Sequence, residues 1–393
     1  MPLWQVGGLQ RVVDAVSTFA RESPLLAALV VVGLLVFLVG VRMAIGRVRR
    51  LPGERLQRLL GSTDELAVLM HPNPDPDAMS CALATGKLAT RAGTDPTLYY
   101  PGQIRHQENR AFQTVLDLDF NRIETASQIE EDEVVLVDHN EARGFPGAEG
   151  IDPLAVIDHH PGGGEGGDFT DVRTDYGACA TIFAEYFESL DWDLIDPDEE
   201  ATVDPEGDYI DPEIATGLLY GIQSDTKQLT KGCCSAEFDA AEYLYEGIDE
   251  DMLDRIANPQ VDAEVLDVKA RAITDREIRN AFAVSDVGEI SNVDAIPQAA
   301  DELLRLEGVT AVVVMGRKGD TLHLSGRSRD DRVHMGKVLE TVVADIPMGS
   351  AGGHARMGGG QLSIDHMNGI GPGSGVAMPD FKSHLFDAMA GDI

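Results

Sequence analysis

Lysine is scarce in this chain, and acidic residues far outnumber basic ones. Only seven of its 31 basic residues are lysine, against 67 acidic residues, so the formal net charge of the 393 residues is −36. A chain of this charge offers no basic stripe for duplex nucleic acid, and we therefore expect no duplex DNA partner. Because the acidic residues are dispersed along the chain, we also predict a halophilic, haloarchaeal source, where high salt screens their repulsion.

Cysteine is scarce as well. The chain has four cysteines, no two of them spaced as C-x-x-C, and Cys233 and Cys234 are adjacent. This spacing suits neither a structural zinc site nor a disulfide framework. We expect reduced thiols that serve packing.

Long apolar runs are missing from all but one part of the sequence. Ser23–Val41 holds 19 residues without a charge, close to the ~20 that cross roughly 30 Å of hydrocarbon. An arginine cluster begins at Arg42, and this bias predicts a single-pass protein of the cell membrane with its C-terminal side in the cytoplasm. A cleaved signal peptide is the alternative, but its apolar region is normally shorter. We thus expect a transmembrane helix at about 23–43, within an N-terminal segment 1–51.

After that segment, apolar strands alternate with helical stretches. Glu65–Met70, Val134–Val137 and Leu154–Ile157 have the composition of buried strands, and Ala78–Thr90 that of a helix. This alternation predicts an α/β domain with a mostly parallel sheet. Ligands of such sheets bind beyond the C-terminal ends of the strands. The acidic, proline-rich stretch Asp191–Glu213 is typical of a solvated insertion.

Four short segments concentrate Asp and His near the ends of these elements. They contain, in order, His71, Asp75 and Asp77; Asp138 and His139; Asp158, His159 and His160; and Asp225. Any one of these residues could instead cap a helix or pack in the core, but four such segments together favour metal binding. Carboxylate and imidazole ligands suit Mn²⁺, with Mg²⁺ or Co²⁺ as alternatives. One carboxylate can bridge two ions roughly 3.5–4 Å apart, an arrangement that activates water for phosphoester hydrolysis.

The order H-x-N-P-D-x-D-A, V-D-H, D-H-H and S-D-T is similar to the four motifs of the DHH-family phosphoesterases. That family includes RecJ exonucleases, nanoRNA and pAp phosphatases, cyclic di-AMP phosphodiesterases and family II pyrophosphatases. The resemblance covers roughly residues 65–393. It implies a parallel-sheet DHH catalytic domain (52–235), a helical linker (236–276) and a smaller α/β DHH-associated domain that binds substrate (277–393).

The resemblance also implies that six of these side chains bind two divalent ions. The first ion would be held by His71 and Asp75, the second by Asp77, His159 and Asp225, and Asp138 would bridge the two.

Catalytic roles are implied in the same way for Asp138, His160 and Asp158. His160 would face the phosphate, while Asp158 would hold an imidazole in position without touching a metal ion. The stretch Val137–Glu141 also resembles the second motif of family II pyrophosphatases, in which case His139 could contact phosphate.

The C-terminal part ends in a glycine-dense tail that resembles the DHH-associated domain of the nuclease and dinucleotide branch. Glycine lets backbone N–H groups approach a phosphate, and arginine supplies a planar fork for it. The residues predicted to bind substrate are Arg327, Ser328, Gly352, Gly353 and His354.

We therefore predict a metal-dependent phosphodiesterase that hydrolyses cyclic di-AMP, very short oligonucleotides or both, through a water activated by two metal ions. The alternatives are a phosphatase of pAp or another small phosphomonoester, an inorganic pyrophosphatase, and a non-enzymatic nucleotide sensor. The expected partners are a small nucleotide substrate and the membrane, with a homodimer as the oligomeric state to consider.

Overall fold

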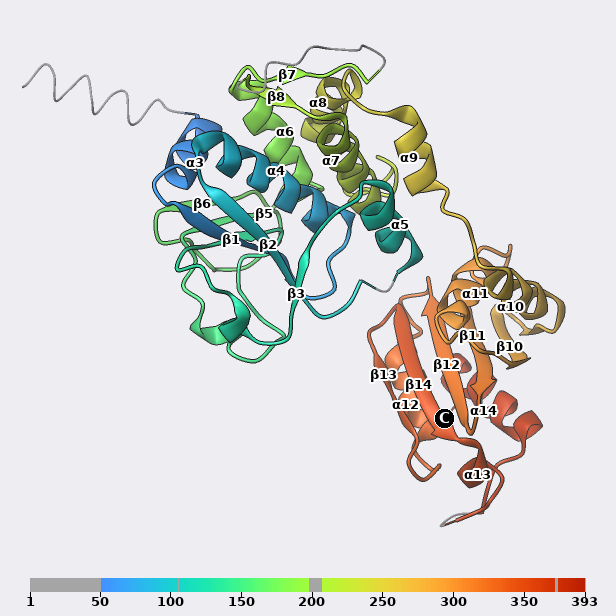
Figure 1. Cartoon of the computed structure of the whole chain (residues 1–393). Coiled ribbons are helices and arrows are strands. Elements are labelled where there is room, and N and C mark those ends of the chain that lie inside the picture. Colours follow the sequence, from blue (N-terminus) through green and yellow to red (C-terminus); the bar gives the residue numbers. More distant parts are fainter. Residues whose placement is uncertain (1–50, 105, 198–206, 372–373, 393) are drawn as a thin grey trace, which may run out of the picture. The chain divides into compact units, whose positions relative to one another are not determined.

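The structure is a computed structural model of the chain, and it describes residues 51–104, 106–197, 207–371 and 374–392 (Figure 1). The chain divides into two units between Pro259 and Gln260. This division falls inside the segment 236–276 that was predicted to be a helical linker.

The predicted location in the membrane is not supported. Among the described residues, no helix is both long and apolar enough to cross a bilayer; the longest, α4 (Pro76–Ala92), has 17 residues, fewer than the ~20 that a crossing requires. We therefore withdraw the predicted single-pass location with a cytoplasmic catalytic domain. The apolar run 23–43, on which that prediction depended, lies outside the described residues.

The first unit is built on the predicted parallel sheet. Its six strands lie in the order β3 (Asn121–Ile123), β2 (Asp95–Pro101), β1 (Glu65–Leu69), β4 (Val134–Val137), β5 (Ala155–Asp158) and β6 (Phe169–Val172). All five pairings are parallel. The chain moves outward from β1 through β2 to β3 and then returns to β4, so the strand order reverses between β1 and β4. Ligands of open α/β sheets bind at such a reversal, beyond the C-terminal strand ends.

Both faces of this sheet are covered, which explains why its strands are continuous apolar runs. Leu66 and Val68 of β1 pack in the larger core, whose helices are α3 (Pro52–Leu60), α4, α5 (Gln107–Val115), α6 (Cys179–Ser189), α7 (Pro212–Asp225), α8 (Ser235–Tyr245) and α9 (Glu250–Ala257). Ala67 and Leu69 point to the opposite face and a smaller apolar cluster. The loops on that face include the short 3₁₀ helices η1 (Ala126–Gln128) and η2 (Ala148–Gly150).

Part of the acidic insertion is ordered against the first unit. Two short strands, β7 (Asp193–Leu194) and β8 (Tyr209–Ile210), pair in parallel, and residues 198–206 between them lie outside the described residues. The Lys87 ammonium of α4 pairs with Asp211 at 2.7 Å. The insertion is therefore less detached from the domain than its composition suggested.

The second unit contains a mixed six-stranded sheet. Its strands lie in the order β13 (Ser350–Gly353), β14 (Met357–Ser363), β12 (Thr321–Ser328), β11 (Ala311–Lys318), β10 (Phe282–Glu289) and β9 (Glu277–Arg279). Helices α12 (Met335–Val343) and α14 (Met378–Ala390) pack in the core of one face. Helices α10 (Ala263–Thr274) and α11 (Ala295–Leu303) pack in the core of the other, and α13 (Ile364–Met367) follows β14. Strands β11 and β12 form a hairpin, in which Lys318 of β11 pairs with Thr321 of β12.

Candidate metal centre

The first motif forms a loop at the C-terminal end of β1, and that loop becomes the start of α4. Asp75 is the N-cap of the helix, where its carboxylate accepts the N–H of Ala78 at 3.1 Å. His71 donates its Nδ1–H to the carbonyl of Pro72 at 3.1 Å. In the neutral ring, this bond leaves the lone pair on Nε2, which lies 3.7 Å from a carboxylate oxygen of Asp75. A neutral imidazole fixed in this way is the form that binds a metal ion.

Asp138 lies at the centre of the site, directly after β4. Its backbone has the left-handed φ of 60°, a conformation that costs about 1–3 kcal/mol in a non-glycine residue and is typical of functional sites. The side chain is 1% exposed, with Oδ2 3.3 Å from Nε2 of His71 and Oδ1 3.4 Å from Nε2 of His159. Neither carboxylate oxygen accepts a hydrogen bond from the described residues. The two oxygens thus face two different imidazoles.

The second group of ligands comes from three elements. Asp77 in the first turn of α4, His159 after β5 and Asp225 at the end of α7 lie together, with Nε2 of His159 3.8 Å from Asp77 and 3.7 Å from Asp225. His159 donates Nδ1–H to the carbonyl of Tyr176 at 3.2 Å. In the neutral ring, Nε2 is therefore the nitrogen that can bind a metal ion. That nitrogen is buried and has no hydrogen-bond partner among the described residues.

The pKa values of the proposed ligands reflect an excess of negative charge in this site. Burial would lower the pKa of His71, but the nearby carboxylates of Asp138 and Asp75 outweigh it and raise that pKa to about 11. Burial opposes the shift at His159 too, yet the nearby carboxylate of Asp138 raises its pKa to about 10. Burial and the charges of Asp75 and Asp138 raise the pKa of Asp225 to about 7. In the absence of metal ions, protons therefore supply the missing positive charge.

The residues present fit divalent ions. Two sets, His71 with Asp75 and Asp138, and Asp77 with His159 and Asp225, each have ligand atoms within 4.8 Å of one another. Unpaired polar atoms on Asp138 and His159 are costly in a buried place unless something outside the chain completes them. All donors are nitrogen or oxygen, as Mn²⁺, Mg²⁺ or Co²⁺ would require. The structure brings all six predicted ligands together.

His160 and Asp158 form a separate pair at the edge of the site. The ring of His160 donates Nδ1–H to Asp158 at 2.9 Å, and this bond is the main cause that raises the pKa of His160. Asp158 is fully buried and also accepts the N–H of His159 at 2.7 Å and an amide hydrogen of Asn140 at 2.6 Å. The His160 side chain is 46% exposed, so its Nε2 is available to a substrate.

His139 lies differently from the other imidazoles. It is 2% exposed, and its Nδ1–H bonds to the carbonyl of Val137 at 2.9 Å. Burial lowers its pKa to about 4. A buried neutral ring of this kind supports the loop after β4 and offers little surface to a phosphate.

The substrate-binding residues predicted in the second unit differ in exposure. Arg327 donates through Nε to Asp301 of α11 at 2.6 Å, and Nη1 donates to the hydroxyl of Ser325 at 3.0 Å. Ser328 is 4% exposed, and its hydroxyl donates to the carbonyl of Asp330 at 3.0 Å. Gly353 and His354 are exposed at the end of β13.

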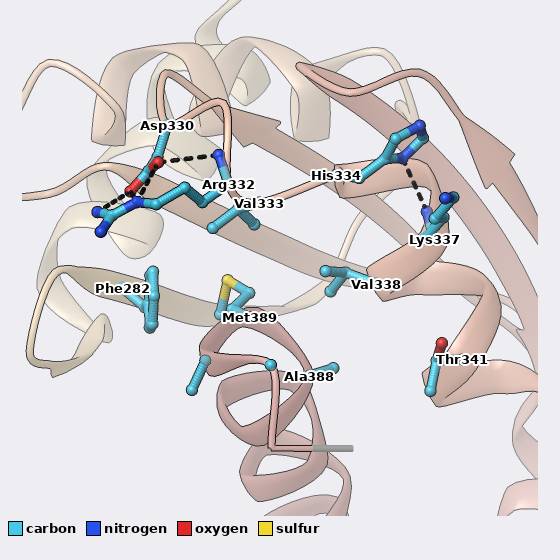
Figure 2. A pocket seen from close by; sticks show the side chains of 12 residues that line it. Phe282, Asp330, Arg332, Val333, His334, Lys337, Val338, Thr341, Ala388 and Met389 are labelled. Atoms are coloured by element: carbon cyan, nitrogen blue, oxygen red, sulfur yellow. Dashed lines mark hydrogen bonds and ion pairs between the residues drawn. The ribbon is translucent and has the colours of Figure 1, made fainter.

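Two depressions lie on the surface of this unit. One, of about 450 Å³, is lined by Gly352 and neighbouring residues of β12 and β14, and its lining includes no acidic residue. The other, of about 410 Å³, is shown in Figure 2 and lies between the start of α12 and the end of α14. There the guanidinium of Arg332 is already bonded to both oxygens of Asp330.

Several contacts that hold the ligands were missed by sequence reasoning. The N–H groups of Cys179 and Ala180, at the start of α6, donate to the two oxygens of Asp77 at 2.7 and 2.8 Å. The carbonyl of Tyr176 and the amide of Asn140 hold His159 and Asp158. The backbone groups have no side-chain signature, whereas Asn140 stood inside a recognised motif and could have been singled out.

The chain matches two protein families. Residues 65–222 match the DHH family, N-terminal domain, and residues 279–370 match the DHHA1 domain.

Curated relatives are found in archaea and bacteria. An uncharacterized protein of Methanocaldococcus jannaschii is 35% identical over 296 residues, which cover 72% of this chain and 58% of that protein. The cyclic-di-AMP phosphodiesterase GdpP of Geobacillus thermodenitrificans is 29% identical over 81% of this chain and 48% of its own length. A probable manganese-dependent inorganic pyrophosphatase of Deinococcus radiodurans is 35% identical over 41% of this chain and 46% of its own. The chain thus spans about half the length of the curated relatives it matches.

Proposed function

Because the chain belongs to the DHH family of phosphoesterases, we propose that it is a divalent-metal-dependent phosphodiesterase that hydrolyses cyclic di-AMP or very short oligonucleotides. The observation that carries the proposal is the geometry of Asp138. Its two unpaired oxygens face Nε2 of His71 and Nε2 of His159 at 3.3 and 3.4 Å. A carboxylate placed in this way can join two ion sites, which is the arrangement that phosphoester hydrolysis uses.

Each ligand in this proposal has a defined task. His71 and Asp75 hold one ion, Asp77, His159 and Asp225 hold the other, and Asp138 belongs to both. Bound Mn²⁺ ions would lower the pKa of a water molecule and neutralise the phosphoryl oxygens.

His160 is the group that we assign to the substrate. Its Nδ1–H is fixed on Asp158, so its Nε2 is directed away from that bond. The raised pKa of His160, caused chiefly by Asp158, favours an imidazolium that can donate a hydrogen bond to the phosphate or a proton to the leaving oxygen. Asn140 and two backbone N–H groups hold the carboxylate of Asp158 in place.

The substrate class is supported by the second unit. A site made of metal ions alone accepts any small phosphoester that reaches it, so discrimination must come from other contacts. The depression beside Gly352 and the exposed His354 are the surfaces that we assign to the nucleotide, with Arg327 and Ser328 at the end of β12 and Gly353 at the end of β13. The match of 29% identity to a cyclic-di-AMP phosphodiesterase over 81% of the chain favours a dinucleotide.

A substrate panel tests the proposal. The purified chain would be given cyclic di-AMP, its linear product, oligoribonucleotides of two to five residues, pAp and pyrophosphate, each with Mn²⁺ in molar salt. We expect the dinucleotides to have the highest kcat/KM and chelation of the metal to abolish turnover. Preferential hydrolysis of pAp or of pyrophosphate would show that the proposed substrate class is wrong.

Inorganic pyrophosphatase is the second candidate, because 41% of the chain is 35% identical to a probable manganese-dependent pyrophosphatase. Two observations weigh against it. The C-terminal unit matches the DHHA1 domain, and His139, which could contact phosphate in a pyrophosphatase, is 2% exposed.

A further inference from the structure

One short stretch of chain holds two of the three ligands in the second group. Residues 173–180 connect β6 to α6. Within them, the carbonyl of Tyr176 accepts the Nδ1–H of His159 at 3.2 Å. Two N–H groups at the start of α6 donate to the carboxylate of Asp77 at 2.7 and 2.8 Å. The position of this stretch therefore sets the orientation of both ligands.

The other ligand group is held by different parts of the chain. His71 is oriented by the carbonyl of Pro72, and Asp75 is fixed by the N–H of Ala78 in the first turn of α4. A change confined to residues 173–180 should thus alter the ligand orientation in one group and leave the other unchanged, except through Asp138, which both groups share.

Arg173 fixes the stretch at its first residue. Its guanidinium forms a bidentate pair with Asp171, with Nε–Oδ1 and Nη2–Oδ2 distances of 2.9 and 2.8 Å. It also pairs with Glu185 of α6, and Nη1 donates to the hydroxyl of Tyr176 at 3.1 Å. That hydroxyl in turn donates to Glu185 at 2.6 Å. One side chain thus joins β6, the turn and α6.

The backbone of the turn is bonded as well. Arg173 donates its N–H to the carbonyl of Asp158 at 2.9 Å, and Tyr176 donates its N–H to the carbonyl of Arg173 at 3.0 Å. The Arg173 side chain is 18% exposed and its guanidinium lies 5.1 Å from the centre of the Tyr176 ring. A lysine could not reproduce this set, because it lacks the planar fork.

We propose that Arg173, together with Asp171 and Glu185, is the positioning residue for one of the two ion sites. It holds the turn so that Tyr176 orients His159 and the start of α6 orients Asp77. The proposal depends on the two-ion site of the proposed function, but not on the substrate. Groups that orient metal ligands through hydrogen bonds typically change metal affinity about 10- to 100-fold.

The test is a Mn²⁺ titration of the metal-free full chain by calorimetry, with the melting temperature measured in parallel. We expect two ions per wild-type chain. Arg173→Met should weaken the binding of one ion about 10- to 100-fold and leave the affinity of the other within about twofold of wild type. Arg173→Lys should give an affinity between those of the wild type and Arg173→Met. Glu185→Gln, which removes a charge but little volume, should weaken the binding of the same ion to a smaller degree. This variant keeps the test valid if Arg173→Met does not fold.

The affected ion is identified by combining variants. Asp225→Asn should remove the ion in question, so adding Arg173→Met to it should leave the affinity of the remaining ion unchanged. Arg91→Met is the matched control, because Arg91 also forms an ion pair within the first unit, with Asp208, and should leave both affinities unchanged.

Three results would overturn the proposal: equal weakening of both ions, unchanged binding in all Arg173 and Glu185 variants, or fewer than two ions in the wild type. A purely structural role predicts the first of these, since partial unfolding affects both sites together. Selective loss of one ion in a chain that hydrolyses none of the nucleotides would retain this inference and reject the proposed function.

Discussion

The side chains singled out as binding residues are held in opposite ways in the two units of the chain. In the first unit, Asp138 and His159 carry buried polar atoms with no hydrogen-bond partner among the described residues. In the second, the guanidinium of Arg327 is bonded to Asp301 and to Ser325. A buried polar atom without a partner costs about 1–3 kcal/mol. Such atoms also occur in the second unit, on Arg276, Ser285, Arg317 and His366. It is therefore the convergence of ligand groups around the unpaired atoms of Asp138 and His159 that indicates something binding from outside the chain. A paired arginine gives no such indication.

The structure alone is therefore enough to locate the candidate metal centre, but not the substrate-binding surface of the second unit. The metal centre is recognisable from unpaired atoms, shifted pKa values and converging ligands. The second unit offers depressions of similar volume, among them those of about 450 and 410 Å³, which a binding measurement distinguishes.

Asp138→Asn should have the largest effect. The substitution keeps the shape of the side chain but removes the charge shared by both ion sites, so we expect phosphodiesterase activity to fall at least about 1,000-fold, or about 4 kcal/mol in the activation barrier. Initial rates in saturating Mn²⁺ measure it. Asp239→Asn, an exposed position on α8, is the control. More than a tenth of wild-type activity in Asp138→Asn would exclude the two-metal mechanism.

Metal binding should be strongly pH-dependent. Without ions, His71 and His159 have pKa values of about 11 and 10, raised by the nearby carboxylates against the opposing effect of burial. Both are thus protonated at pH 7 and must lose a proton before they can bind an ion. Mn²⁺ affinity should rise about tenfold per pH unit for each ion between pH 6 and 8.

Calorimetry in two buffers of different ionisation enthalpy checks the same point directly. At pH 7 at least two protons should be released per chain, one from each histidine, with a further part from Asp225, whose pKa of about 7 leaves it partly protonated. Release of no protons, with an affinity independent of pH, would mean that these two imidazoles are not ligands.

Much of the first unit could be predicted from the sequence. The strands before His71, Asp138 and Asp158 are short apolar runs because both faces of the sheet are covered, and the motif order identified all six candidate ligands. The contacts that orient them could not be predicted, because the carbonyl of Tyr176 and the N–H of Cys179 are backbone groups whose positions depend on the packed fold.

The second unit was harder to predict for a related reason. The glycine-dense tail contains two strands, β13 and β14, although glycine disfavours strands. The strand β14 pairs with β12, with Ser325 opposite Gly359 and Arg327 opposite Met357, and β13 pairs in turn with β14. The β12 partners are distant in the sequence and leave no local pattern. Likewise, nothing in the sequence around Arg327 indicated that Asp301 would pair with it.

Arg327→Ala distinguishes a binding role from a structural one. If Arg327 contacts the nucleotide, kcat/KM for a dinucleotide should fall about 10- to 100-fold, the usual loss for a charged hydrogen bond to phosphate. A generic substrate such as bis(p-nitrophenyl) phosphate, which makes few remote contacts, should lose much less. Asp301→Asn is the matched control, since it breaks the same ion pair but leaves the arginine available. Equal losses in both variants and on both substrates would show that the pair serves the fold alone.

The smallest effect is expected in the depression of Figure 2, at Arg332. Its side chain is 89% exposed and bonded to Asp330, and exposed ion pairs of this kind contribute little. If the depression beside Gly352 binds the nucleotide, Arg332→Ala should change kcat/KM for dinucleotides by less than about twofold and leave the melting temperature nearly unchanged. Lys337→Gln, in the same depression, should behave alike. A loss greater than about tenfold in either variant, with the generic substrate spared, would assign the nucleotide to this depression instead. The two units would then be more alike than they appear, because the second would also bind its ligand through charged side chains.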